Sequence, residues 1–203
     1  MKGILIMKKN VNVRQLVTIG VAAAVSFVLM LLNFNLPIAP AFIKFDFSDI
    51  PSLILAFSFG PFAGAMTELI KNILHLFNTS TMGVGELSNF LLGCAFVIPA
   101  GIVYKHNKTR KGALIAMLTG TLCFSFMGIL SNYFIMFPFY TTLMNIPMEA
   151  IIGMCQKIIP SIDSQFEVIL LSVTPSNLIK GIAVSLVTFL LYKRLSPILK
   201  QFS

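Results

Sequence analysis

The chain has 203 residues, of which 57% are hydrophobic and 11% charged, and its formal net charge is +8. Soluble domains carry about 25% charged residues. A soluble enzyme of this length is therefore excluded, because it could not bury so much apolar surface. Repeated apolar runs of about 20 residues are typical of helical membrane proteins. We predict a single membrane domain over residues 1–203, an all-α integral membrane protein built as a six-transmembrane-helix bundle.

Six spans are predicted, in chain order, at residues 13–32, 47–59, 62–77, 86–104, 112–137 and 174–192. Pro138 is expected to close the fifth span, because proline ends many helices. Thr174 is expected to cap the sixth span, with Pro175 in its first turn. Residues 139–172 are predicted to form an amphipathic connection at the membrane surface.

Basic and acidic residues are segregated along the chain. Eleven of the 15 Lys and Arg residues form three clusters: Lys2, Lys8, Lys9 and Arg14; Lys105, Lys108, Arg110 and Lys111; Lys193, Arg194 and Lys200. Cytoplasmic segments of membrane proteins carry an excess of Lys and Arg. The clusters therefore indicate a multi-pass protein of the cell membrane with both termini cytoplasmic. They do not indicate binding to nucleic acid.

The sequence carries no recognisable catalytic or metal-binding motif. Its three cysteines show no CxxC spacing, its two histidines are isolated, and GxxxxGK[ST], GxSxG and HExxH are all missing from it. We therefore expect neither an enzyme nor a metal site. A small integral membrane enzyme remains the alternative of another class, and its only candidate groups are Glu68, Lys71 and His75.

Two predicted spans carry polar residues that a bilayer disfavours. Asn177 and Lys180 share one helix face near the predicted outer end of the sixth span, and inserting a lysine costs about 2.5–3.5 kcal/mol. No acid within one turn of that helix neutralises Lys180, which favours a binding site. Snorkelling by Lys180 and capping by Asn177 are the alternatives. Asn132, in the fifth span, is either a ligand contact or an interhelical hydrogen bond.

The third span has a polar stripe formed by Glu68, Lys71, Asn72 and His75. Glu68 and Lys71 are spaced to form an ion pair, so packing is favoured over a binding site for this stripe. Glu86 begins the fourth span, where the helix dipole alone accounts for a carboxylate.

Residues 41–49 alternate phenylalanines with charged residues, which fits either a lid over a planar ligand or an interfacial anchor. The first span carries small residues at four-residue spacing, Gly20 with Ala24 and Ala22 with Ser26. This spacing lets another helix approach closely.

Five stretches of the chain, taken together and in order, resemble a known family. They are residues 44–51 (KFDFSDIP), 60–72, 80–90 (STMGVGELSNF), 132–140 and 175–181 (PSNLIKG). They are similar to the substrate-binding S-components of energy-coupling factor (ECF) vitamin transporters, and most similar to the riboflavin-specific members. An S-component for thiamine, biotin or pantothenate is the same-class alternative.

The resemblance implies a substrate-capture subunit that binds riboflavin at the outer face as its transported ligand, without a cofactor. Transport then needs an ECF module of two ATPases and one transmembrane coupling protein, which would dock through the first span at Gly20, Ala22, Ala24 and Ser26. The substrate-binding residues that it implies are Phe42, Lys44, Val84, Gly85, Asn132, Asn177 and Lys180. An Asn amide can match the donor and acceptor edge of a flavin ring, a lysine can donate to a ring carbonyl, and phenylalanine can cover the ring face.

Overall fold

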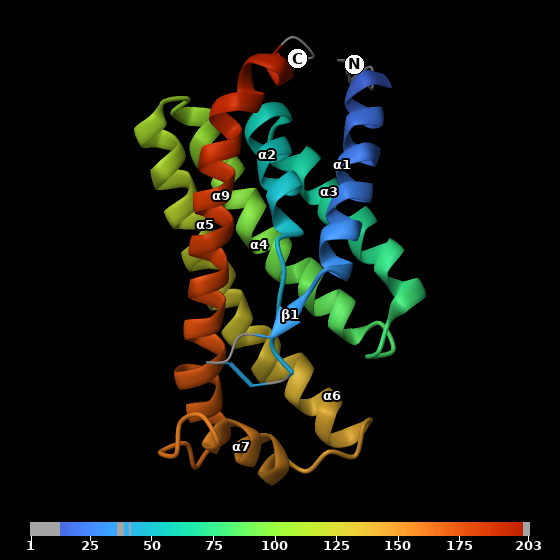
Figure 1. The fold of residues 1–203 in the computed structure, drawn as a ribbon, viewed down its shortest axis with the longest axis vertical. Helices are drawn as coiled ribbons and strands as arrows, with labels where there is room; N and C mark the ends of the chain where they lie inside the picture. The colour runs from blue at the N-terminus through green and yellow to red at the C-terminus, as the bar shows by residue number, and fades with distance from the viewer. Residues whose placement is uncertain (1–12, 36–38, 41, 201–203) are drawn as a thin grey trace, which may run out of the picture.

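The computed structural model describes residues 13–35, 39, 40 and 42–200, with side chains up to residue 192. The described chain is almost entirely helical and forms an elongated bundle (Figure 1). Its α-helices are α1 (Val13–Leu31), α2 (Asp49–Phe59), α3 (Pro61–His75), α4 (Val84–His106), α5 (Arg110–Ser131), α6 (Phe137–Thr142), α7 (Met148–Gln156), α8 (Gln165–Glu167) and α9 (Thr174–Lys200). A short 3-10 helix, η1 (Leu76–Asn78), follows α3, and two π-helical turns, η2 (Asn132–Met136) and η3 (Val168–Val173), precede α6 and α9.

Four helical segments of the described chain are long and apolar enough to cross a membrane: Val13–Leu31, Val84–His106, Arg110–Thr142 and Gln165–Tyr192. They confirm the all-α membrane architecture. The helix α2 is apolar but has only 11 residues, and α3 has 15 residues that include a buried acid and a buried lysine. The assignment of α2 and α3 as further spans stays a prediction.

Two of the long segments pass through prolines that were expected to end or begin a helix. Pro138 does not close the fifth segment: it lies in the first turn of α6, directly after η2, where its missing N–H costs little. Thr174 does not cap the last segment either. That segment begins ten residues earlier in sequence number, where Ser164 and Glu167 form a capping box, and it continues through η3 into α9.

The connection between the last two long segments, Arg110–Thr142 and Gln165–Tyr192, lies at one end of the molecule. There α7 runs across the ends of the long helices (Figure 1). Its buried residues Ile151 and Cys155 join a hydrophobic cluster with Phe137 and Ile169, and Phe42 packs against the same cluster. The main core lies elsewhere, among α2, α4, α5 and α9, and it includes Phe96 and Phe124. The bundle therefore has a main core and a second hydrophobic cluster at the end that carries α7. We call the part of the chain around this second cluster, from Phe137 to Val173, the cap.

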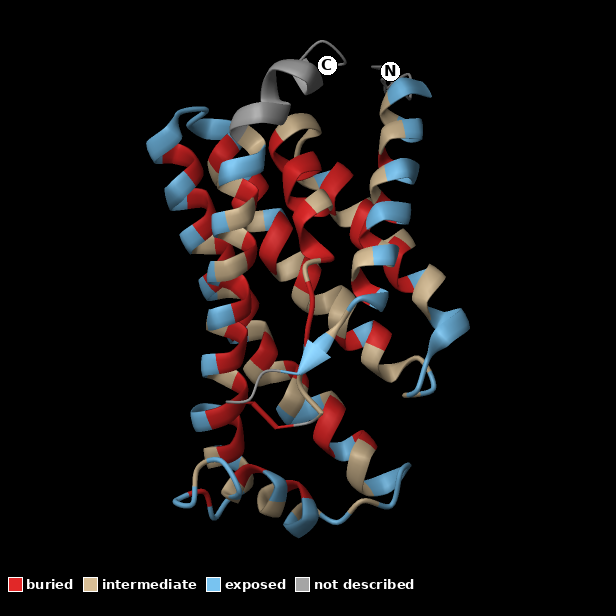
Figure 2. Cartoon of the chain, viewed as in Figure 1, coloured by how far each residue is buried: buried red, intermediate tan, exposed pale blue. Residues whose placement is uncertain are grey.

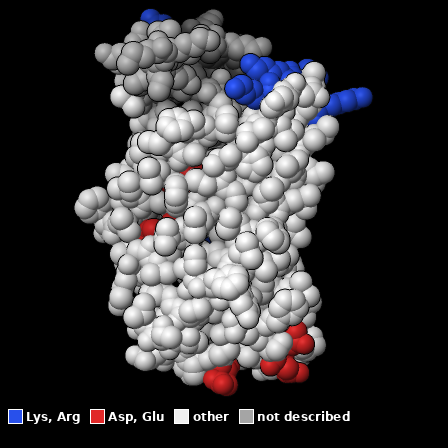
Figure 3. All heavy atoms as spheres, turned by 180° about the vertical axis from the view of Figure 1, so that it is seen from behind, with Lys and Arg blue, Asp and Glu red and all other residues white. Residues whose placement is uncertain are grey.

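The two ends of the molecule differ in charge. Figure 3 shows Lys and Arg gathered at the end that carries the α4–α5 connection, and Asp and Glu at the opposite end. The acids of the α7–α8 region are Glu149, Asp163 and Glu167. Lys2, Lys8 and Lys9, and the side chains of Lys193, Arg194 and Lys200, lie outside the described residues.

The predicted small-residue surface of α1 is divided between two sides of the helix. Figure 2 shows exposed residues along the outside of α1 and buried residues facing the bundle. Gly20 and Ala24 are exposed, Ala22 is half-buried, and Ser26 is completely buried. Ser26 therefore faces the bundle, and the expectation that it belongs to an outward docking surface is wrong.

Candidate ligand-binding site

A cavity of about 460 Å³ lies between the main core and the cap. Its size is typical of pockets that bury a small organic ligand. The cavity is lined by residues of many elements. They come from α1, the loop before α2, α3, α4, α5, η2, α6 and the segment that follows it, η3 and α9. Its polar and aromatic lining includes Phe42, Lys44, Asp46, His75, Thr81, Gly85, Glu86, Asn132, Tyr140, Asn177 and Lys180.

The loop between α1 and α2 folds over the cavity through a short antiparallel hairpin. Its strands β1 (Phe34–Asn35) and β2 (Lys44–Phe45) pair Phe34 with Phe45 and Asn35 with Lys44. Aromatic contacts between Phe34, Phe45 and Phe47 hold this turn of chain together. In the connection between the two strands, the ring of Phe42 lies 6.3 Å from that of Tyr140 on α6, edge to face. The loop thus reaches from α1 to the cap, as a lid would.

The ammonium group of Lys180 is held by two carboxylates from another part of the chain. Its Nζ lies 3.1 Å from Oδ2 of Asp46 and 3.3 Å from Oδ2 of Asp49. It also lies 5.9 Å from the centre of the Phe124 ring. The helix that carries Lys180 starts about 22 Å away along its axis, at 1.5 Å per residue, so the lysine is not near the end of its span. No acid lies within one turn of Lys180 on its own helix, as predicted, but the carboxylates of Asp46 and Asp49 neutralise it from the loop and α2.

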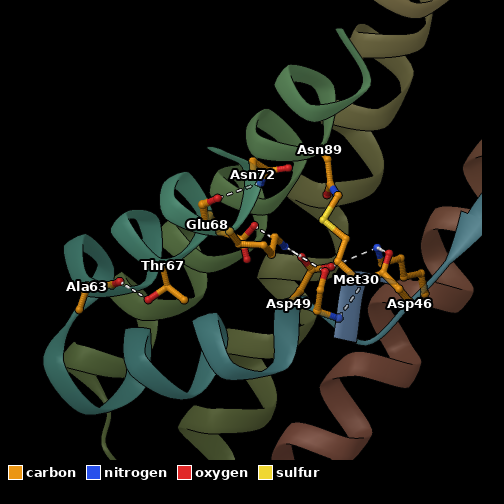
Figure 4. Close-up of polar contacts among 11 residues, drawn as sticks. Met30, Asp46, Asp49, Ala63, Thr67, Glu68, Asn72 and Asn89 are labelled. Carbon is orange, nitrogen blue, oxygen red and sulfur yellow. Dashed lines mark hydrogen bonds and ion pairs between the residues drawn. The ribbon is translucent and has the colours of Figure 1, made fainter. Parts of the chain in front are cut away.

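A second lysine, Lys71 on α3, extends this ion network. Its Nζ lies 2.7 Å from Oδ1 of Asp49 and 2.6 Å from Oε2 of Glu68, and it donates to the hydroxyl of Ser48 at 3.1 Å. Figure 4 shows Asp46, Asp49 and Glu68 converging from the loop, α2 and α3. The predicted pairing of Glu68 with Lys71 is confirmed. Since Lys71 and Glu68 are fully buried, breaking one partner would leave an uncompensated charge.

Two asparagines present complementary groups at the cavity. Nδ2 of Asn132 donates to the backbone oxygen of Gly128 at 2.9 Å, which leaves its side-chain oxygen as the acceptor on offer. Nδ2 of Asn177 is buried without a hydrogen-bond partner among the described residues. A Cβ atom at Gly128 would overlap this nitrogen, so α5 admits the Asn177 amide only because position 128 is glycine. Asn177 itself lines the cavity, and a buried donor without a partner calls for an explanation, which a bound ligand would supply.

A second polar cluster lies where α3 passes into α4. The carboxylate of Glu86 accepts hydrogen bonds from Thr79 at 2.9 Å and Thr81 at 3.1 Å, and it lies 2.8 Å from Nδ1 of His75. Gly85 lies in the same turn, where a Cβ would overlap the hydroxyl of Thr81. Glu86 therefore has side-chain partners besides the helix N-terminus, and it also lines the cavity.

Six of the seven predicted binding residues line the cavity: Phe42, Lys44, Gly85, Asn132, Asn177 and Lys180. Val84 is the exception: it is half-buried in the first turn of α4 and is not among the described residues that line the cavity. The sequence reasoning did not assign Asp46, His75, Glu86 and Tyr140 to the site. The alternation of acids and aromatics in residues 42–49 was the one available signal for Asp46.

Hydrogen-bond donors, acceptors and aromatic rings therefore surround a cavity of ligand size. Among the described residues, no group of three or more His, Cys, Asp or Glu side chains is placed to hold a metal ion. The free thiols of Cys94 and Cys123 are half-buried, and Cys155 is buried. The polar groups that line the cavity are arranged to bind a molecule.

Comparison with known proteins agrees with this geometry. The family model described as "ECF transporter, substrate-specific component" matches residues 14–192. The riboflavin transporter RibU of Staphylococcus aureus (strain TCH60) is 33% identical over 198 residues, which cover 96% of this chain and 98% of the relative. The riboflavin transporter FmnP of Bacillus subtilis (strain 168) is 32% identical over 194 residues, which cover 94% of this chain and 96% of the relative.

A solved structure, described as "Structure and mechanism of the S component of a bacterial ECF transporter", has the same fold. It superposes with a TM-score of 0.71 at 34% sequence identity, and covers 92% of this chain and 98% of that one. Four long apolar helices and a family match over nearly the whole chain lead to one assignment. The chain is a membrane protein and not an enzyme, and it belongs to the family of substrate-specific components of ECF transporters.

Proposed function

We propose that this chain captures riboflavin in the cavity between its core and its cap. The observation that carries the proposal is the set of polar groups at the cavity: the free amide nitrogen of Asn177, the carbonyl oxygen of Asn132 and the ammonium of Lys180. The polar edge of an isoalloxazine ring presents an N–H between two carbonyls. The two donors on the protein, the Asn177 amide and the Lys180 ammonium, suit the two carbonyls, and the Asn132 oxygen suits the N–H. The names of the relatives support the same ligand.

The rings of Phe42 and Tyr140 supply apolar cover for the planar part of the ligand. Both line the cavity, and they touch each other from the loop and from α6. Aromatic side chains stack favourably on planar rings. The loop residues 42–49 therefore act as the lid, and the polar ribityl chain lies toward the side of the cavity that Glu86 and Thr81 line.

The test is a titration of the detergent-purified protein with riboflavin, followed by quenching of the flavin fluorescence. We expect saturation at one riboflavin per chain, and we expect Lys180→Ala to weaken binding by about tenfold, as for a lost hydrogen bond to a charged donor. Thiamine, biotin and pantothenate serve as competitors. Displacement of riboflavin by one of them, or the lack of any quenching, would contradict the assignment of riboflavin.

We further propose six spans, with α2 and α3 as the two short ones, and both termini in the cytoplasm. The basic α4–α5 connection supports this orientation, because Lys and Arg accumulate on the cytoplasmic side. The acidic end with α7 and the cavity then faces outward. Reaction of single cysteines introduced at Lys108 and Glu149 with a membrane-impermeant thiol reagent in intact cells tests this orientation. We expect labelling at Glu149 only.

Energy for uptake would come from an ECF module of two ATPases and one coupling protein. This module would dock on the side of α1 that faces away from the bundle. Gly20 and Ala24 are exposed there and let a partner helix approach closely. Ala24→Leu is expected to abolish coupled uptake while riboflavin binding is unchanged. Ile115→Phe adds similar bulk to the exposed side of α5 and serves as the control. Normal uptake by the Ala24→Leu variant would exclude this docking side.

A further inference from the structure

The carboxylate of Asp46 is fixed at both of its oxygens. Oδ1 accepts a hydrogen bond from the backbone N–H of Ser48 at 2.8 Å, and Oδ2 accepts one from Nζ of Lys180 at 3.1 Å. Asp46 is 5% exposed and lies 134 positions before Lys180 in the chain. The short turn to Ser48 orients the carboxylate, and the ion pair joins the loop to α9.

The same loop carries residues that cover the cavity. Phe42 and Lys44 lie a few positions before Asp46, and all three line the cavity. The ring of Phe42 reaches the cap, where it touches Tyr140. The segment from Phe42 to Asp46 is therefore held at both of its ends: Phe42 contacts the cap, and Asp46 is paired with Lys180 on α9.

An ammonium group has three N–H donors. Asp46 and Asp49 engage the ammonium of Lys180 from the side of α2 and the loop. A third donor remains for the cavity that Lys180 also lines. The two carboxylates thus set the direction in which Lys180 can donate to a ligand.

We infer that Asp46 is a positioning residue for the bound ligand: it orients the ammonium of Lys180 and holds the loop closed over the cavity. This inference rests on the proposed function, because it describes how the same cavity retains riboflavin. A ligand that leaves past the loop must break the ion pair of Asp46 with Lys180. A ligand enters while the loop is open and the ion pair is broken, so loss of the pair raises the dissociation rate more than it changes the association rate.

The variant Asp46→Asn tests this role. Asparagine keeps the size of the side chain and an oxygen for the N–H of Ser48, but it removes the charge that faces Lys180. We expect the dissociation rate of riboflavin to rise about tenfold, as for the loss of a charged hydrogen bond, and the association rate to change less than twofold. Stopped-flow fluorescence measures both rates. An unchanged or slower dissociation rate would overturn the inference.

A double-mutant cycle separates positioning from a merely structural role. If Asp46 acts through Lys180, then Asp46→Asn has less than a twofold effect on Kd in the Lys180→Met background. If the two residues act independently, the two effects multiply, and the inference fails. The double variant Asp46→Asn/Lys180→Met removes both charges of the ion pair. Unlike Lys180→Met alone, it does not leave Asp46 as a carboxylate without its lysine.

Glu149→Gln is the matched control, because it removes an exposed carboxylate from α7 at the same end of the molecule. We expect it to leave both rates unchanged. If Asp46→Asn fails to fold, Asp46→Ser takes its place, because serine also removes the charge and keeps an oxygen for the N–H of Ser48; an unchanged dissociation rate there would equally overturn the inference. Riboflavin binding by the unmodified chain separates the two proposals: without it the proposed function fails, and with it only the role of Asp46 is in question.

Discussion

Position 128 offers the sharpest test of the cavity geometry. The change is Gly128→Ala, which adds one methyl group to α5 where the amide nitrogen of Asn177 lies. The methyl group and the amide overlap, so Asn177 must move by about 1 Å, more than the ~0.5 Å that a binding constellation tolerates. A ligand carbonyl left without its donor costs about 1–3 kcal/mol. The predicted loss of riboflavin affinity is therefore about 5- to 150-fold.

The assay is the fluorescence titration, paired with thermal unfolding in detergent. Alanine is a better helix former than glycine by about 1 kcal/mol, so a general loss of helix is not expected. Gly153→Ala is the control, because a Cβ at that position of α7 meets nothing within 4 Å. Equal affinity in the Gly128→Ala and Gly153→Ala variants would refute the position assigned to Asn177.

Three further predictions concern the rest of the bundle. Lys71→Met leaves the buried carboxylate of Glu68 without a cation and Asp49 with Lys180 alone, so it should lower the free energy of unfolding by about 3–5 kcal/mol, whereas the exposed Lys157→Met should not; equal melting temperatures would contradict the ion network. Burial raises the pKa of the Cys155 thiol, which lowers its thiolate fraction at pH 8. In a chain without the other two cysteines, maleimide should therefore label it quickly only after denaturation, and rapid labelling of the folded chain would contradict its burial. Tyr192→Phe removes the 2.6 Å hydrogen bond to Tyr104 but keeps the ring contact, so it should cost about 1 kcal/mol without changing riboflavin affinity, because neither tyrosine lines the cavity; weaker binding would contradict this placement of the cavity.

Residue patterns alone predict much of this fold, because hydrophobic runs and basic clusters are local signals. The helices, and most of the predicted residues that line the cavity, follow from them and from the resemblance. The expected break at Pro138 and start at Thr174 were wrong for a physical reason. Each proline follows a π-helical turn, and a wider turn lets the helix run on past a residue without an N–H donor.

The electrostatics of the site could not be read from neighbours in sequence. Lys180 has no acid on its own helix face, yet two carboxylates reach it from the loop and α2. Pairing across more than 130 positions depends on the fold, and no local pattern encodes it. The role of Gly128 is hidden for the same reason, since only the crossing of α5 and α9 shows what a methyl group would displace.

The most direct test of the account is the absorbance spectrum of the chain purified from cells supplied with riboflavin. We predict a yellow protein with the visible bands of a flavin, close to one flavin per chain, and released flavin that is riboflavin by chromatography. A colourless protein that also takes up no added riboflavin would contradict the central claim.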